Sequence, residues 1–186
     1  MGSEMCIRDS NLSGLDVKWS FMTKILARLG HWRRKNTLSG SKKNIQEHYD
    51  LSNEMFMTFL DDTMTYSCGF FEKKNDSLYQ SQINKIDKII DKADIKEKHH
   101  ILEIGSGWGA LAKRAVERTG CKVTTITLSE RQHEYVKNMI KKEKLENSID
   151  VQLVDFRNIE GSYDRIVSVE MIEAIGYDLF NSYFDR

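Results

Sequence analysis

The segment ILEIGSGWGALA, residues 101–112, constrains the fold of this chain more than any other part of the sequence. A short apolar run is followed by Gly105, Gly107 and Gly109 and then by residues typical of a helix. Glycine lets the backbone turn sharply and approach a ligand closely. The order strand, glycine turn, helix therefore predicts a βαβ unit with a binding site at the turn, rather than a tight turn alone.

The alternation of strands and helices continues after this segment. Strands are predicted at 101–104, 122–127, 149–154 and 164–169, with helices between them that run to about residue 119 and from 130 to about 144. This pattern indicates an α/β fold with a parallel, doubly wound sheet. Upstream, helices are predicted at 17–35 and 44–60, and the capping-box pair Ser77 and Gln80 predicts the start of another.

Composition and charge divide the chain into three parts. Residues 1–10 have no periodicity and are interpreted as a leader or an artefact. The net charge of zero conceals a basic segment, 11–43, which contains eight Lys or Arg residues and a single acidic residue, Asp16. Its amphipathic helix either packs on the protein or lies on an anionic bilayer. Residues 44–186 form the expected catalytic domain.

Two general features favour a cytoplasmic protein. No apolar run reaches the length of about 18 residues that a transmembrane helix needs. Cys6, Cys68 and Cys121 are odd in number and far apart, which argues against a disulfide framework or a zinc site. We expect a protein of the reducing cytoplasm, which would be peripheral on the inner face of the membrane if the basic helix lies on the bilayer.

Two cofactors compete for the glycine turn. Gly105, Gly107 and Ala110 also fit the dinucleotide pattern G-x-G-x-x-G/A, so a nicotinamide-dependent oxidoreductase is one alternative. Glu103 argues against it, because nucleoside-binding methyltransferases place an acid two residues before the first glycine. The strand that ends at Thr127 also lacks the terminal acid that would bind a ribose.

Polar residues follow the second and third predicted strands. Ser129 and Gln132 form a capping box that starts a helix, but this leaves Thr127 and Gln132 able to face a ligand at the sheet edge. Asp155 is either a turn residue or an acceptor for an adenine amino group.

The chain resembles the cyclopropane-fatty-acyl-phospholipid synthase family of S-adenosylmethionine-dependent methyltransferases. The resemblance covers about residues 38–186, and HYDLSN with MTYSC is its most discriminating part. The matching stretches, in order, are NIQEHYDLSNEMFMTFLDDTMTYSCGFFE (44–72), ILEIGSGWGALA (101–112), TITLSERQ (125–132), VDFR (154–157) and IVSVEMIEAIG (166–176).

The resemblance implies a Rossmann-like sheet of the class I methyltransferase type and a set of site residues. Thr127 and Gln132 would hold the ribose or methionine end of S-adenosylmethionine, and Asp155 and Phe156 would lie near its adenine. The full set of expected cofactor-binding residues is Tyr66, Ser67, Glu103, Gly105, Gly107, Thr127, Gln132, Asp155 and Phe156. Cys68 and Glu173 correspond to positions that hold a bicarbonate ion at the reacting centre.

Two departures from the family pattern are visible. Ala174 stands where many members have histidine, which bears on the product. The family sheet has seven strands, of which four are recognisable before Arg186. We therefore expect an N-terminal fragment whose domain is incomplete at its C-terminus, and which is inactive by itself.

The resulting hypothesis is a lipid C-methyltransferase. It would transfer a methyl or methylene group from S-adenosylmethionine to the double bond of unsaturated acyl chains in membrane phospholipids, forming cyclopropane fatty acids. Bicarbonate would remove a proton to close the ring, and no nucleic acid partner is expected. The alternatives are a methyl-branched or methylene-bearing product, the oxidoreductase, and a membrane-binding module without activity.

Overall fold

The computed structural model describes residues 52–175 and 179–185. These residues belong to one compact unit, Asn36–Arg186. The predicted leader, the basic segment 11–43 and the first part of the helix predicted at 44–60 lie outside the described residues.

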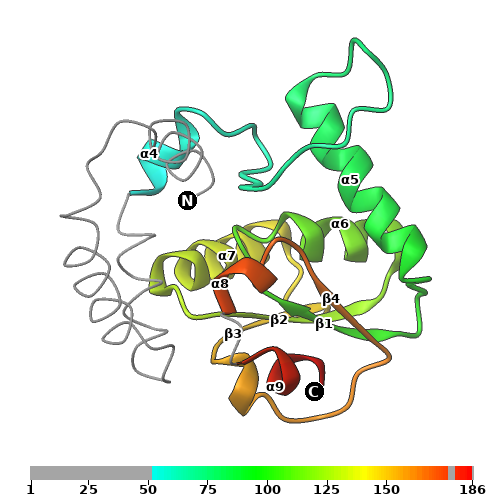
Figure 1. The fold of residues 1–186 in the computed structure, drawn as a ribbon, viewed down its shortest axis with the longest axis vertical. Coiled ribbons are helices and arrows are strands. Elements are labelled where there is room, and N and C mark those ends of the chain that lie inside the picture. The colour runs from blue at the N-terminus through cyan, green and yellow to red at the C-terminus, as the bar shows by residue number, and fades with distance from the viewer. Residues whose placement is uncertain (1–51, 176–178, 186) are drawn as a thin grey trace, which may run out of the picture. The chain divides into compact units, whose positions relative to one another are not determined.

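A parallel sheet forms the centre of this unit (Figure 1). The strand order is β3-β2-β1-β4, and every pair of neighbours is parallel. Glu103, near the end of one central strand, is in register with Thr125 and Val167 on either side. The parallel sheet confirms the predicted α/β class. The strands are β1 His100–Ile104, β2 Lys122–Thr127, β3 Ile149–Leu153 and β4 Arg165–Ser168.

Three helices cover one face of the sheet, as Figure 1 shows. Ile86 and Ile90 of the first, Ala112 of the second and Val136 of the third are buried in one apolar cluster with side chains from all four strands. These helices are α5 Leu78–Lys92, α6 Ala110–Thr119 and α7 Glu130–Glu143.

Shorter elements cover the opposite face. Leu102, Ile104 and Ile126 point to this side because side chains alternate along a strand. They pack with Phe156 and Ile175. The covering elements are the 3-10 turn η2 Phe156–Asn158, α8 Ile172–Ile175 and α9 Phe180–Phe184.

The helix starts follow the sequence signals. The hydroxyl of Ser77 accepts a hydrogen bond from the Gln80 amide, and that of Ser129 accepts one from the Gln132 amide. Both predicted N-caps are thus confirmed. Gly109 opens α6 with φ +89°, and a Cβ atom there would lie 2.7 Å from the Cε of Met139. The Met139 methyl is the end of a flexible side chain and can move, so it is the positive φ that favours glycine at this junction between α6 and α7.

The part of the helix predicted at 44–60 that lies within the described residues is shorter than predicted. The helix α4 is Asn53–Met57, capped by Ser52, and it ends three residues earlier than predicted. Thr58 caps this end, because its amide and its hydroxyl both donate to the carbonyl of Met55. Such local side-chain bonds compete with helix formation.

We find no helix within 52–175 and 179–185 that is long and apolar enough to cross a membrane.

Candidate functional site

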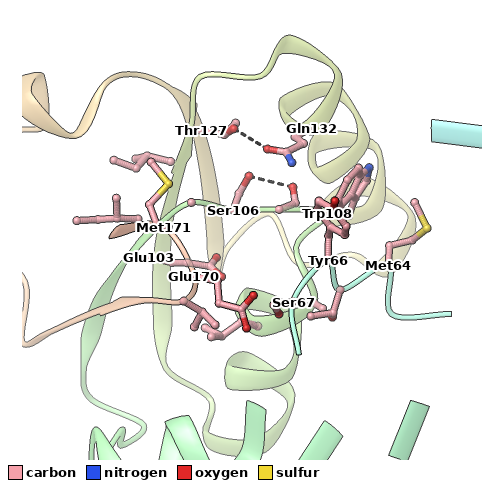
Figure 2. A pocket seen from close by; sticks show the side chains of 18 of the residues that line it. Met64, Tyr66, Ser67, Glu103, Ser106, Trp108, Thr127, Gln132, Glu170 and Met171 are labelled. Carbon is pink, nitrogen blue, oxygen red and sulfur yellow. Dashed lines mark hydrogen bonds between the residues drawn. The ribbon is translucent and has the colours of Figure 1, made fainter. Parts of the chain in front are cut away.

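A pocket opens at the carboxyl edge of the sheet, where β1 and β4 lie side by side (Figure 2). The chain leaves β1 toward β2, whereas β4 lies on the other side of β1, so the strand order reverses here. Open α/β sheets bind ligands at such a switch point. Ile104, Thr127, Val154 and Val169, at or just after the ends of the four strands, all line the pocket.

The glycine turn forms the floor of this pocket. The amides of Gly105 and Ser106 both donate to the carbonyl of Ile126, at 3.0 and 2.9 Å, which fixes the turn to β2. Gly105 and Gly107 have φ of +95° and +50°, in the region that favours glycine. A Cβ atom on Gly107 would meet no atom within 4 Å. Protein packing therefore does not require a glycine at 107, and the open space suits a ligand.

Thr127 and Gln132 are buried together at one end of the pocket (Figure 2). The Thr127 hydroxyl donates to Gln132 Oε1 at 2.9 Å and accepts from the Ser129 amide at 3.1 Å. The first bond fixes which side of the Gln132 amide can donate. The pair is therefore preorganised to hold the polar part of a small molecule.

Glu103 is the buried acid of the pocket, with 5% of its surface exposed. Burial raises the pKa of Glu103 to about 8, and the hydroxyl of Thr125, which donates to Oε2 at 2.6 Å, opposes this only in part. The side chain is thus protonated at neutral pH. A cationic ligand beside it would favour the ionised form, so the position suits a positively charged group.

The loop that follows α4 forms a second wall. Met64, Tyr66 and Ser67 line the pocket from this side. Gln82 on α5 donates from Nε2 to the Ser67 carbonyl at 2.8 Å, and the Lys85 ammonium is hydrogen-bonded to the Ser67 hydroxyl. Helix α5 thus positions the preceding loop through a contact between Gln82 and Ser67, which are fifteen residues apart in sequence.

Aromatic rings connect this wall to the glycine turn. Trp108, inside the turn, donates from Nε1 to Asn53 Oδ1 at 3.1 Å. Its ring packs against that of Phe56 in a tilted arrangement, with 4.7 Å between centroids. The ring of Tyr66 lies edge-on to Phe56, with 5.4 Å between centroids, and is 49% exposed. Tyr66 therefore offers a supported ring to whatever occupies the pocket.

Most of the expected cofactor-binding residues meet in this one pocket. Asp155 is the exception: it is buried beside the pocket but does not line it. Burial raises its pKa, but hydrogen bonds from Arg157 at 2.8 and 2.6 Å outweigh burial, and the pKa is lowered. The residues that do line the pocket are Tyr66, Ser67, Glu103, Gly105, Gly107, Thr127, Gln132 and Phe156.

The structure places Cys68 and Glu173 outside the lining of the pocket. Cys68 is exposed, and a hydrogen bond with Glu170 raises the pKa of its thiol, so it is a poor nucleophile. Glu173 is exposed in the first turn of α8. Their predicted role at the reacting centre therefore gains no support from the shape of the pocket.

Among the lining residues that sequence reasoning missed are Lys85, Trp108 and Glu170. A signal existed for Glu170, because it lies two residues after β4, at the edge where such sheets bind ligands. Lys85 offered none, since one lysine on an amphipathic helix is ordinary. Among the described residues no group of His, Cys, Asp and Glu side chains could hold a metal ion.

Comparison with known proteins identifies the family. The family model described as mycolic acid cyclopropane synthetase matches residues 36–186. The chain belongs to the mycolic acid cyclopropane synthetase family. This confirms the resemblance drawn from the five sequence stretches.

Relatives of known name support this membership. The tuberculostearic acid methyltransferase UfaA1 of Mycobacterium tuberculosis is 41% identical over 154 residues, which cover 77% of this chain and 35% of that protein. The methoxy mycolic acid synthase MmaA3 of the same organism is 38% identical over 141 residues, which cover 76% of this chain and 48% of that protein.

Solved structures of this family share the fold. The cyclopropane synthase MmaA2 from Mycobacterium tuberculosis matches with a TM-score of 0.76 and 35% identity, over 78% of this chain and 51% of that one. The mycolic acid cyclopropane synthase CmaA1, complexed with SAH and CTAB, matches with a TM-score of 0.75 and 36% identity, over 77% of this chain and 50% of that one. The chain thus spans about half the length of these solved relatives.

The fold is that of class I methyltransferases, as predicted. Coclaurine N-methyltransferase, bound to N-methylheliamine and SAH, matches with a TM-score of 0.62 at 23% identity. At that identity the likeness concerns the fold alone.

Proposed function

We propose that the pocket binds S-adenosylmethionine and that the full-length protein uses it to methylate lipid acyl chains. The observation that carries the proposal is the glycine turn at the switch point, with open space over Gly107 and a preorganised Thr127–Gln132 pair beside it. When bound, S-adenosylmethionine supplies an electrophilic methyl group on a sulfonium.

The residues of the pocket suit this cofactor in charge as well as in shape. S-adenosylmethionine carries an ammonium and a sulfonium, and Glu103 is a buried acid that ionises readily beside a cation. Thr127 and Gln132 would hold its hydroxyl or amino-acid groups, and Phe156 would pack near the adenine.

A dinucleotide is the weaker alternative. It needs an acid at the end of β2 for the ribose, and β2 ends at Thr127, whose hydroxyl is already bonded to Gln132. Glu130 lies nearby but forms the first turn of α7. Family membership also favours the methyl donor over a nicotinamide.

The acceptor we propose is the double bond of an unsaturated acyl chain in a membrane phospholipid, with a cyclopropane as product. An alkene becomes a cation when it is methylated, so the pocket must exclude water and surround the cation with ring faces. Tyr66 lines the pocket and can offer one such ring face to the cation. Phe59, Phe70 and Phe71 are exposed and do not line it.

A methyl-branched product is a second candidate. The relative with 41% identity is named a tuberculostearic acid methyltransferase, whereas the solved structures at 35% and 36% identity are named cyclopropane synthases. Both products begin with the same methyl transfer. Ring closure with loss of a proton from the new methyl group gives a cyclopropane, and loss of a proton without ring closure gives a methylene-bearing or unsaturated branched chain. A saturated methyl branch requires in addition a two-electron reduction by a separate hydride donor.

Labelled lipids from cells that express the full-length gene test the proposal. Methionine labelled with three deuterium atoms on its methyl group should yield acyl chains that carry the label. In a cyclopropane the new methylene should keep two of the three deuterium atoms, because one is lost when the ring closes. NMR of the fatty-acid methyl esters distinguishes a ring from a branch. Unlabelled acyl chains, with the protein present and folded, would contradict the proposed activity.

A further inference from the structure

A positive charge lines the pocket from helix α5. Lys85 is half-buried there, and it is the only lysine or arginine in the lining among the described residues. Its ammonium is hydrogen-bonded to the hydroxyl of Ser67. Burial lowers the pKa of Lys85, which means that the surrounding protein disfavours the charged form. An anionic ligand beside this side chain would favour the charged form again.

The protein's own acids leave this ammonium without a close partner. No salt bridge joins Lys85 to a carboxylate in the described part of the chain. Glu170, Cys68 and Asp61 raise the pKa of Lys85 through their charges, but less than burial lowers it. An ammonium has three donors, and the bond to Ser67 uses one of them. Lys85 can therefore donate to an incoming anion.

This charge lies at the other end of the pocket from the Thr127–Gln132 pair. Figure 2 shows Ser67 and Glu170 on one side of the pocket and Thr127 and Gln132 on the opposite side. The Thr127–Gln132 end is neutral and offers hydroxyl and amide groups. The Ser67 end contains both a cation, Lys85, and a carboxylate, Glu170. A ligand that spans the pocket therefore meets neutral polar groups at one end and charges at the other.

S-adenosylmethionine, whose binding here is the proposed function on which this inference rests, has a matching distribution of charge. Its ribose is neutral and carries hydroxyl groups, whereas its amino-acid end carries an ammonium and a carboxylate beside the sulfonium. Two acids line the pocket, Glu103 and Glu170, and they can face the two cationic centres. Lys85 remains as the partner for the carboxylate.

We propose that Lys85 binds the carboxylate of the cofactor's amino-acid end and thereby distinguishes S-adenosylmethionine from adenosyl compounds that lack this group. Ser67 holds the ammonium at the pocket wall, and Gln82, on the same helix as Lys85, donates from Nε2 to the Ser67 carbonyl at 2.8 Å. Helix α5 thus supplies both the charge and its support. Hydrogen bonds between ionised groups are stronger than neutral ones, so this contact should contribute strongly to affinity.

Bicarbonate is the other anion to consider, because the family resemblance implies one. The resemblance places it at Cys68 and Glu173, and neither of these residues lines the pocket. Lys85 does line it, together with the glycine turn at Gly105 and Gly107. This favours the cofactor's carboxylate as the anion at Lys85.

Two ligands that differ only in the carboxylate test the assignment in the full-length protein. S-adenosylmethionine and its decarboxylated form share the adenosine, the sulfonium and the ammonium. Lys85→Met removes the charge and keeps most of the length, and Lys85→Arg keeps the charge. The matched control is Lys92→Met, which removes an exposed charge from the last turn of the same helix, outside the pocket. Isothermal titration calorimetry, with and without sodium bicarbonate, measures the affinities, and urea unfolding checks that each variant is folded.

The expected result is a loss confined to the ligand that has the carboxylate. Lys85→Met should bind S-adenosylmethionine about 10- to 100-fold more weakly, because a hydrogen bond between charged groups is lost. Its affinity for the decarboxylated form should not fall, since a like charge no longer faces the ligand's ammonium. Lys85→Arg should keep most of the wild-type preference for the carboxylate, and Lys92→Met should keep all of it.

Three results would overturn this assignment while S-adenosylmethionine still binds the wild type. Unchanged affinity in Lys85→Met would show that the carboxylate binds elsewhere. An equal loss for both ligands would show that Lys85 only orders the Ser67 wall. Competition of bicarbonate with S-adenosylmethionine in the wild type, but not in Lys85→Met, would assign Lys85 to that ion. A wild type that binds neither ligand would contradict the proposed function itself, and the inference with it.

Discussion

Gly107 has a positive φ and open space above its Cα atom. We expect Gly107→Val to lower S-adenosylmethionine affinity more than about 100-fold, about 3 kcal/mol of binding free energy, because the isopropyl group would fill the ligand's space. Isothermal titration calorimetry measures the change.

Gly120 provides a matched control for backbone strain. It ends α6 with φ +74° and lies outside the pocket. Valine in the left-handed region costs about 1–2 kcal/mol of folding free energy at either position. Gly120→Val should therefore be destabilised to a similar degree and still bind the cofactor. Normal binding by a folded Gly107→Val variant would place the site elsewhere.

Glu103 should make the stability of the protein depend on pH. Its pKa is raised from 4.5 to about 8 in the folded state, so between these values the folded protein binds more protons than the unfolded chain. The free energy of unfolding then falls as pH rises, by up to about 1.4 kcal/mol per pH unit from this group. The stabilisation is complete below pH 4.5 and lost above about 8.

The variant Glu103→Gln isolates this contribution. Glutamine stays neutral, so the difference in unfolding free energy between variant and wild type should shift in favour of the variant as pH rises from 5 to 8.5. Urea unfolding at several pH values measures it, and Glu146→Gln controls for the loss of an exposed carboxylate. A difference that stays constant with pH would mean that Glu103 is ionised in the folded protein.

At the residue scale, the sequence predicted side chains whose role follows from a strand end or a glycine turn. Thr127 and Gln132 were expected at the pocket and line it. Glu170 was missed although it is closer to β4 than the predicted Glu173. The choice between the two depends on the direction of each side chain, and that is set by a positive φ which a motif does not reveal.

At the element scale, the side chain of Gln82 links α5 to the Tyr66–Ser67 wall. Its Nε2 donates to the Ser67 carbonyl, whereas its buried Oε1 has no hydrogen-bond partner among the described residues. Gln82→Leu removes a hydrogen bond worth about 1 kcal/mol but also removes the cost of the unpaired oxygen. Stability should therefore change little.

The same substitution should weaken the cofactor site. Without the bond to Ser67 the loop must be ordered by the ligand, so we expect roughly a tenfold loss of S-adenosylmethionine affinity. Gln80→Leu, on the exposed side of α5, should leave affinity unchanged. Equal affinities for the two variants would show that α5 does not position the wall.

The same scale shows how far local signals determine the fold. The strands and α5 to α7 agree with prediction within one or two residues, because glycines and serine caps mark their ends. The end of α4 could not be predicted from apolar spacing, since the bonds from Thr58 to the Met55 carbonyl mark it. Pairing of β4 with β1 is a long-range property, which the alternating pattern implied only through the fold class.

At the scale of the whole molecule, β4 is an edge strand among the described residues, paired with β1 alone. Ile166 on this strand is 49% exposed. Unpaired apolar strands associate with other chains, and lysine on an edge opposes this. We expect Ile166→Lys to raise the concentration at which the 186-residue chain self-associates in sedimentation velocity.

Leu78→Lys is the control for a general gain in solubility, because Leu78 is 43% exposed but lies on α5. Both substitutions should change the free energy of unfolding by less than about 0.5 kcal/mol. If Leu78→Lys suppresses association as strongly as Ile166→Lys, the edge of the sheet is not the cause.

Calorimetric titration of the protein with S-adenosylmethionine and, separately, with NAD tests the central claim most directly. The pocket contains a glycine turn, a buried acid and the Thr127–Gln132 pair, and β2 ends without an acid for a ribose. We predict saturable one-to-one binding of S-adenosylmethionine that Gly107→Val abolishes, and no binding of NAD. Binding of NAD without S-adenosylmethionine would contradict the account.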